Sequence, residues 1–87
     1  MNYEIKESKP CADYEKISIE GRFHLDRNIL YDRLKNTFDK VSSIDRGKII
    51  IAKRKDIEMY LYDDNRFVAS KVESEELGQD ILSNLFM

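Results

Sequence analysis

Hydrophobic and polar residues alternate through residues 57–72, and a polar run at 63–65, Asp-Asp-Asn, interrupts the alternation. A period of two over several residues is typical of a strand that is buried on one face. Asp and Asn tolerate the left-handed backbone that tight turns require. The stretch therefore predicts two antiparallel strands, 57–62 and 66–72, joined by a short turn.

In two other segments the hydrophobic period changes to about four. The rows are Leu30, Leu34 and Phe38, extended by Val41, in the first segment, and Leu77, Ile81 and Leu85 in the second. This spacing predicts amphipathic helices, at 26–40 and from Ser74 to the last residues. Asp26 and Ser74 are suited to cap the two first turns, because their side-chain oxygens can accept from backbone amides.

Two more segments predict strands. Residues 14–23 alternate, with Ile17, Ile19 and Phe23 on one side. Residues 48–54 carry Ile49 and Ile51 on one face and Ile50 and Ala52 on the other, which favours a central strand or one covered by a partner. Residues 1–13 predict a flexible lead-in or a short edge strand at 2–6, because Pro10 and the surrounding charges oppose regular structure.

A chain of 87 residues predicts one domain, which we place at 14–87. We expect an α+β fold: an antiparallel sheet of four to five strands with two helices on one face. The expected order is strand, helix, strand, strand, strand, helix. A ferredoxin-like fold is the alternative, although it would close with a further strand after the second helix.

The run MYLYDDNRFVASKVESEEL at 59–77 and the order of the elements resemble a single repeat of the TATA-box-binding-protein fold. The DNA-binding members have two such repeats and insert phenylalanine wedges between base steps. Here the register turns Phe23 and Phe67 toward the core. The resemblance therefore implies a fold, and no functional residue is carried over from it.

The charge balance gives no global attraction to nucleic acid or anionic lipid: 15 basic and 17 acidic side chains leave a net charge of −2. The first residues lack the apolar segment of a signal peptide, and no run is long and apolar enough to span a membrane. The single cysteine, Cys11, fits a reducing compartment, although a reactive thiol is an alternative. We expect a cytoplasmic protein with no membrane association.

The sheet face turned away from the helices is the main candidate site, because a two-layer fold leaves it open. Tyrosine and aliphatic residues with a charged rim are typical of interfaces. The predicted binding residues are Arg22, Lys48, Ile50, Lys53, Arg54, Tyr60, Tyr62 and Val68. We predict a protein partner, with a second copy in a homodimer as one form of it. A solvated face with ordinary cross-strand pairs is the alternative.

Two other hypotheses concern nucleic acid and catalysis. The basic run at 53–55, together with Tyr60 and Tyr62, could hold a backbone and stack bases. His24 beside Asp26 is the minimal acid–base pair, but the sequence places no nucleophile near it. One histidine and one cysteine do not make a metal site, and the three glycines form no phosphate loop. We therefore expect no enzyme activity, no metal and no cofactor.

Overall fold

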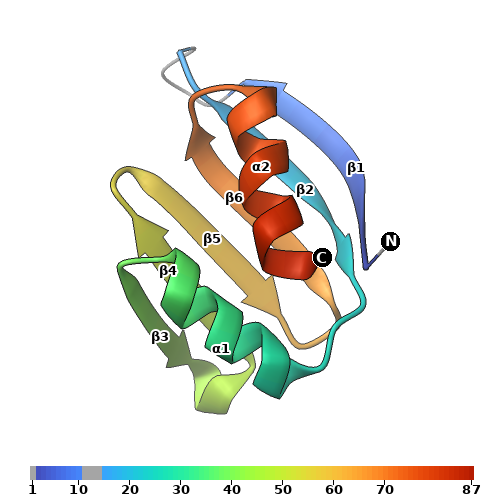
Figure 1. Cartoon of the computed structure of the whole chain (residues 1–87), viewed down its shortest axis with the longest axis vertical. Coiled ribbons are helices and arrows are strands. Elements are labelled where there is room, and N and C mark those ends of the chain that lie inside the picture. Colours follow the sequence, from blue (N-terminus) through green and yellow to red (C-terminus); the bar gives the residue numbers. More distant parts are fainter. Residues whose placement is uncertain (1, 11–14) are drawn as a thin grey trace.

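The structure, a computed structural model, describes residues 2–10 and 15–87, and within these it has a six-stranded antiparallel sheet and two α-helices (Figure 1). The strands are β1 (Tyr3–Pro10), β2 (Ile17–Phe23), β3 (Lys40–Ile44), β4 (Ile49–Arg54), β5 (Ile57–Tyr62) and β6 (Arg66–Val72). The helices are α1 (Arg27–Thr37) and α2 (Glu75–Phe86), and a single 3₁₀ turn, η1, covers Asp45–Gly47. The order across the sheet is β1-β2-β6-β5-β4-β3.

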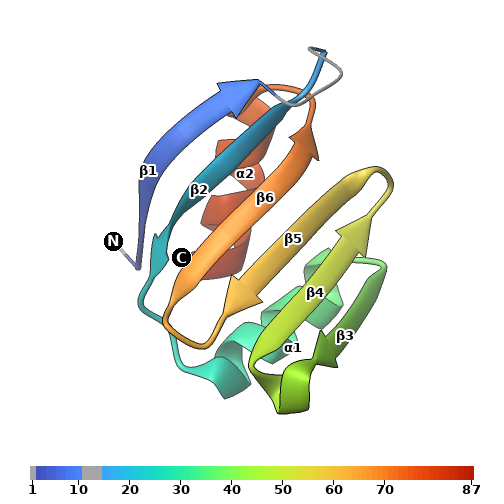
Figure 2. The same ribbon diagram turned by 180° about the vertical axis from the view of Figure 1, so that it is seen from behind.

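The helices α1 and α2 lie on the same face of the sheet, and the view from behind shows the strands with no helix in front of them (Figures 1 and 2). α2 crosses β6, β2 and β1, whereas α1 lies over the β3–β4 side. The predicted α+β class and open antiparallel sheet are therefore confirmed. Four strands, β3 to β6, separate the helices, so the ferredoxin-like alternative, which has two there, is not the observed order.

The core lies between the helices and the covered sheet face. An aromatic cluster fills its β1–β2–β6 half: Phe86 of α2 stacks on Phe23 at 5.3 Å between ring centroids and contacts Phe67 at 5.4 Å and Tyr3 at 5.7 Å. Phe23 and Phe67 are fully buried, as their register predicts. Such a cluster is a large apolar contribution for a chain of this size.

Both predicted helix caps are present. The Asp26 carboxylate accepts from the Asn28 amide at 2.8 Å, and the Ser74 hydroxyl accepts from the Leu77 amide at 3.1 Å. The predicted end of the first helix at residue 40 is wrong, because Phe38 is already extended (φ −113°, ψ 155°). Its ring still reaches the core, and so does Val41, but Val41 does so from a strand.

The expected count of four to five strands is too low, because two edge strands carry weak sequence signals. β3, Lys-Val-Ser-Ser-Ile, turns only Val41 toward the core, and the sequence pattern places its first residues at the end of the helix predicted at 26–40. β1 continues to Pro10 through mostly exposed, charged residues. An edge strand needs hydrogen bonds on one side only, so proline and charges are tolerated there.

Candidate interaction surface on the open sheet face

The open face, the side of the sheet opposite α1 and α2, is organised by the antiparallel register. Residues directly opposite each other on neighbouring strands point to the same face. One such row across the sheet reads Glu7, Glu20, Val68, Tyr60, Ile51 and Ser42, and a neighbouring row contains Tyr62, Ile49 and Ile44. The row of Tyr60 is therefore acidic at the β1–β2 end and apolar from β6 to β4.

The apolar members form one continuous surface, which we call the apolar patch: Ile44, Ile49, Ile51, Tyr60, Tyr62 and Val68. Ile44 is 50% exposed, and the other five are half-buried by their neighbours alone. No helix of the described residues covers them (Figure 2). A contiguous apolar area on an uncovered face is typical of a contact surface for another molecule.

Polar contacts hold the two tyrosines of the apolar patch in place. The Tyr60 hydroxyl donates to the Glu58 carboxylate, and the Lys71 ammonium contacts the same carboxylate at 3.2 Å. The hydrogen bond from Tyr60, followed by that from Lys71, lowers the pKa of Glu58. The same bond to Glu58 raises the pKa of Tyr60. The Tyr60 ring is therefore oriented by contacts within the chain itself.

Tyr62 is held differently. The Arg66 guanidinium lies over its ring, 5.0 Å from the centroid, and Arg66 also donates to the Asp64 carboxylate at 2.7 Å. Arg66 therefore covers one face of the Tyr62 ring while its charge is paired with Asp64. On the other side, Tyr62 lies opposite Ile49 of β4, so its ring continues the apolar patch.

Charged side chains border the apolar patch at opposite edges of the sheet. Glu7 of β1 lies opposite Glu20 of β2, and Lys40 of β3 lies opposite Lys53 of β4. We call the second pair the basic edge, whereas the first pair shares its end of the open face with the cations Lys6, Lys9 and Arg22. Lys9 contacts Glu20 at 3.4 Å, whereas Glu7 has no ion pair among the residues that the structure describes.

Five of the predicted binding residues lie on the open face. Tyr60, Tyr62 and Val68 belong to the apolar patch, and Lys53 belongs to the basic edge. Arg22 is exposed beside them and donates to the Asp64 carbonyl at 3.4 Å.

The other three predicted binding residues lie elsewhere in the fold. Ile50 was placed on the open face, which is wrong: it is 3% exposed and packs in the core, as does Ala52. Both faces of the strand are apolar, so the pattern alone could not choose between them. Lys48 precedes β4 in the turn after η1. Arg54 shares the parity of Ile50 and lies on the helix side.

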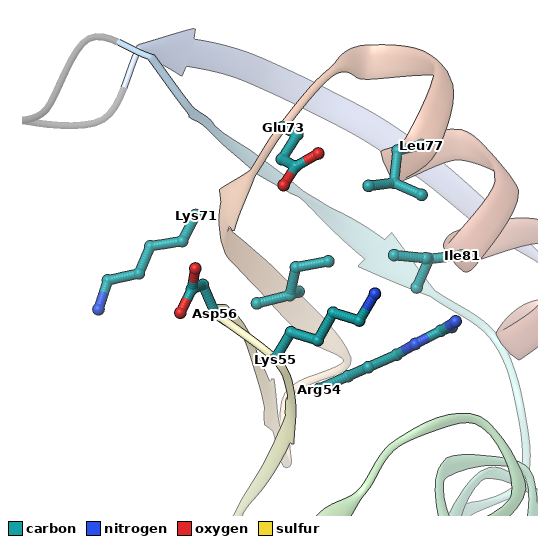
Figure 3. A pocket seen from close by; sticks show the side chains of 8 residues that line it. Arg54, Lys55, Asp56, Lys71, Glu73, Leu77 and Ile81 are labelled. Carbon is teal, nitrogen blue, oxygen red and sulfur yellow. The ribbon is translucent and has the colours of Figure 1, made fainter.

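Arg54 lines a shallow hollow of about 140 Å³ together with Lys55, Ile57, Leu77 and Ile81, where α2 passes the β4–β5 turn (Figure 3). Lys53 faces the other way, and Lys55 sits in the turn with φ +54°. The consecutive cations of the basic run therefore do not form one surface. Only Lys53 lies on the same face as Tyr60 and Tyr62.

Sequence reasoning missed Ile44, Ile49, Ile51 and Lys40 as members of this surface. The signal that could have found the first three is the register itself. A hairpin between 49–54 and 57–62 places Ile49 opposite Tyr62 and Ile51 opposite Tyr60. Ile44 and Lys40 required recognition of β3, which its two serines concealed.

The described residues do not place His24, Asp26 or any potential metal ligands in an arrangement suited to catalysis or metal binding. The Asp26 carboxylate is used as a helix cap, and His24 is exposed next to it. No group of three or more potential metal ligands occurs among residues 2–10 and 15–87. Within the same residues, no helix is long and apolar enough to cross a membrane. Cys11 lies outside the described residues.

The fold and this surface define a small α+β protein that presents one side of an open antiparallel sheet. Comparison of the chain with protein-family models, with the curated proteins and with solved structures finds no match.

Proposed function

We propose that the protein is a non-enzymatic binding or assembly module that engages a protein partner through its open sheet face. The observation that carries the proposal is the apolar patch, which runs over four neighbouring strands on the face that α1 and α2 leave uncovered. Interface cores are enriched in tyrosine and aliphatic residues within a polar rim. The fixed Tyr60 and Tyr62 rings fit that pattern, because ordered aromatic side chains lose little freedom on binding.

Nucleic acid is the alternative partner, since Lys40 and Lys53 lie beside the apolar patch and a tyrosine ring can stack on a base. Two features favour protein. Glu58 faces Lys53 across the strands, next to Tyr60. Arg54 and Lys55 are directed away from the surface, so the cations that would follow a phosphate backbone are not aligned.

The test compares Ile51→Glu, which places a charge in the middle of the apolar patch, with Asn84→Glu, which changes an exposed position on α2. Both purified variants and the wild type are examined by light scattering, alone and with single- and double-stranded oligonucleotides. The tagged chains are also used to capture proteins from a lysate. We expect protein complexes that Asn84→Glu retains and Ile51→Glu loses.

Complexes that survive Ile51→Glu would contradict the proposal. A salt-dependent increase in mass with an oligonucleotide, lost in Lys53→Glu, would move the function to nucleic acid.

We also propose a relation of fold to one repeat of the TATA-box-binding-protein family. From Ile17 onward the elements run strand, helix, four strands in a meander, and helix, which supports the resemblance to one repeat of the TATA-box-binding-protein fold. We also propose a cytoplasmic location, supported by a single cysteine in 87 residues.

A further inference from the structure

β1 and β3 are the two edges of the sheet, and they differ in how they are protected (Figure 2). β1 has an irregular register, ends at Pro10 and carries Lys6 and Lys9, which are the features that prevent strand pairing at an edge. β3 pairs with β4 without a register shift, contains no proline and has a single charged residue, Lys40 at its first position. β3 is therefore the edge to which a further strand can add.

The backbone of β3 presents hydrogen-bonding groups at this edge. The Asp39 amide donates to the Lys53 carbonyl at 2.9 Å, so Lys53 directs its backbone toward β3. In an antiparallel pair the residues that do so alternate along each strand. The alternation turns the backbone groups of Ser42 toward β4, and those of Val41 and Ser43 away from the sheet. Outside the sheet, no backbone hydrogen bond to Val41 or Ser43 is formed by the part of the chain that the structure describes.

The segment that forms this edge is basic, although the whole chain has a net charge of −2. Residues 39–54 have a net charge of +3. The basic side chains are Lys40, Arg46, Lys48, Lys53 and Arg54, and the acidic ones are Asp39 and Asp45. None of the seven forms an ion pair with a residue that the structure describes. Arg54 lies on the helix side, whereas the other four cations lie beside β3 or in the turn that follows it.

We propose that an extended acidic segment of a partner protein adds to β3 as a further antiparallel strand. This inference rests on the proposed function and states the chemistry of the partner. The backbone of the segment bonds to the outward groups of Val41 and Ser43, and its side chains on the open face lie beside Ile44 of the apolar patch. In strand addition, main-chain hydrogen bonds supply affinity, and pockets for alternate side chains supply specificity.

A depression lies on each side of β3 and can receive those side chains. The one on the open face measures about 520 Å³ and is lined by Asp39, Val41, Ser42, Ile51 and the two lysines of the basic edge. The one on the helix side measures about 220 Å³ and is lined by Arg27, Asn28, Tyr31, Ser43, Gly47 and Ile50. Arg27 already donates to the Gly47 carbonyl at 2.6 Å. Because successive side chains of a strand point to opposite faces, the segment should alternate acidic residues on the open face with apolar residues on the helix side.

Two other occupants of this edge fit less well. A second copy of β3 would place two segments of net charge +3 side by side. A nucleic-acid backbone carries no N–H donor, so the outward carbonyls of Val41 and Ser43 would remain unpaired. An acidic strand matches both the charge and the backbone of this edge.

Peptide binding tests the backbone and the charge separately. The probe is a fluorescein-labelled peptide of about eight residues in which Glu and Val alternate. Ser43→Pro removes one outward N–H and leaves the bonds to β4 intact, so it should weaken binding at least about tenfold. Ser43→Ala, the matched control, should bind within about threefold of the wild type. Lys40→Glu with Lys53→Glu should also weaken binding at least about tenfold and should instead favour a peptide of alternating Lys and Val.

The measurements are fluorescence anisotropy and amide hydrogen exchange on the full chain. The amides of Val41 and Ser43 should exchange rapidly in the free protein and slowly with the peptide, whereas the Ser42 amide should be protected in both states. Circular dichroism melting verifies that every variant folds. If Ser43→Pro does not fold, a peptide with N-methylated valines replaces it, because that peptide lacks the same hydrogen bonds and leaves the protein unchanged.

A Glu–Val peptide that does not bind the wild type at about 1 mM, or that binds equally well with N-methylated valines, overturns the inference. A wild type that dimerises alone and becomes monomeric in Ser43→Pro would place a second copy on β3 and also overturns it. Oligonucleotide binding that needs Lys40 and Lys53, in the absence of peptide binding, overturns it as well. These outcomes leave the proposed function standing if Ile51→Glu still removes a captured protein. If Ile51→Glu removes nothing either, both proposals fail.

Discussion

The backbone of β1 passes so close to Gly21 that a side chain has no room there. An ideal Cβ at this position would lie 2.0 Å from the Glu4 carbonyl oxygen and 2.8 Å from the Phe67 ring. The first contact is with backbone, so relief requires β1 to move. Gly78 of α2 is also tight, but its nearest neighbour is the Ile19 Cδ1 atom at 2.4 Å, the end of a flexible side chain.

We expect Gly21→Ala to lower the free energy of unfolding by about 2–3 kcal/mol, because β1 must shift from its neighbour. Gly78→Ala should change it by about 1 kcal/mol or less, since Ile19 can rotate and alanine favours the helix by about 1 kcal/mol. Urea denaturation measures both. Equal losses in the two variants would contradict the distinction between a backbone and a side-chain contact.

The hydrogen bond from Tyr60 to Glu58 gives the open face a specific dependence on pH. The pKa of Glu58 is lowered from 4.5, so its stabilising contribution is complete above pH 4.5 and is lost as pH falls through the folded value. The pKa of Tyr60 is raised from 10.0, so that contribution is complete below pH 10.0 and is lost as pH rises through the folded value.

Tyr60→Phe should therefore lower the free energy of unfolding by about 1 kcal/mol at neutral pH. This value is discounted for the partial exposure of the pair. The difference from wild type should shrink below pH 4.5 and above pH 10.0. Thermal melting across this range is the measurement. Tyr62→Phe is the matched control, because Tyr62 contacts Arg66 through its ring, which phenylalanine retains. If the loss of unfolding free energy in Tyr60→Phe is the same at all pH values, the hydrogen bond to Glu58 is not its source.

Within β4, adjacent isoleucines belong to different surfaces of the molecule. Ile50 lies in the core under α1, and Ile51 lies in the apolar patch opposite Tyr60. Ile50→Ala should cost about 2–4 kcal/mol, because it removes buried atoms and leaves a cavity. Ile51→Ala should cost about 1 kcal/mol or less in the monomer, since the side chain is already half in water. Chemical denaturation at low protein concentration measures both. A larger loss of unfolding free energy in Ile51→Ala than in Ile50→Ala would contradict the observed strand register.

The same strand shows where sequence reasoning reaches its limit. β5 and β6 were predictable, because apolar and polar residues alternate with only one face apolar. The helices and their caps were predictable from the spacing-four rows and from Asp26 and Ser74. In β4 the run Ile-Ile-Ile-Ala has no polar face. Which of its faces is buried therefore depends on its cross-strand partners in β5.

The candidate site was predictable in part for the same reason. The tyrosines were found because β5 alternates, whereas their neighbours Ile49 and Ile51 were assigned to the wrong face. The edge strands contribute few buried side chains, and their structure comes from hydrogen bonds to a neighbouring strand. Those hydrogen bonds form with any sequence that tolerates an extended backbone, so they leave little trace in the hydrophobic pattern.

At the scale of the whole molecule, Phe86 connects elements from both ends of the chain. Its ring contacts Tyr3 of β1, Phe23 of β2 and Phe67 of β6, and it is fully buried. Two hydrogen bonds lie beside it: Asn2 donates its side-chain amide to the Phe86 carbonyl at 2.8 Å, and the Tyr3 hydroxyl lies 3.3 Å from that of Ser83. α2 therefore holds the β1–β2 hairpin against the rest of the sheet.

Phe86→Ala should lower the free energy of unfolding by about 3–5 kcal/mol, the usual cost of removing a buried aromatic ring. Hydrogen exchange should show amides of β1 and α2 losing protection together, because one cluster supports both. The neighbouring Met87→Ala is the control, since Met87 is 61% exposed and should matter little. Protection that persists in β1 while α2 opens would show that the hairpin is stable without the cluster.

The pairing of β2 with β6 and the contacts of residues 2 and 3 with residues 83 and 86 also bear on how the chain is made. During translation the β1–β2 hairpin leaves the ribosome long before its neighbours in the sheet and the helix that covers it. Its apolar side stays exposed to water until α2 has been synthesised. The fold is therefore completed only after most of the chain has been made.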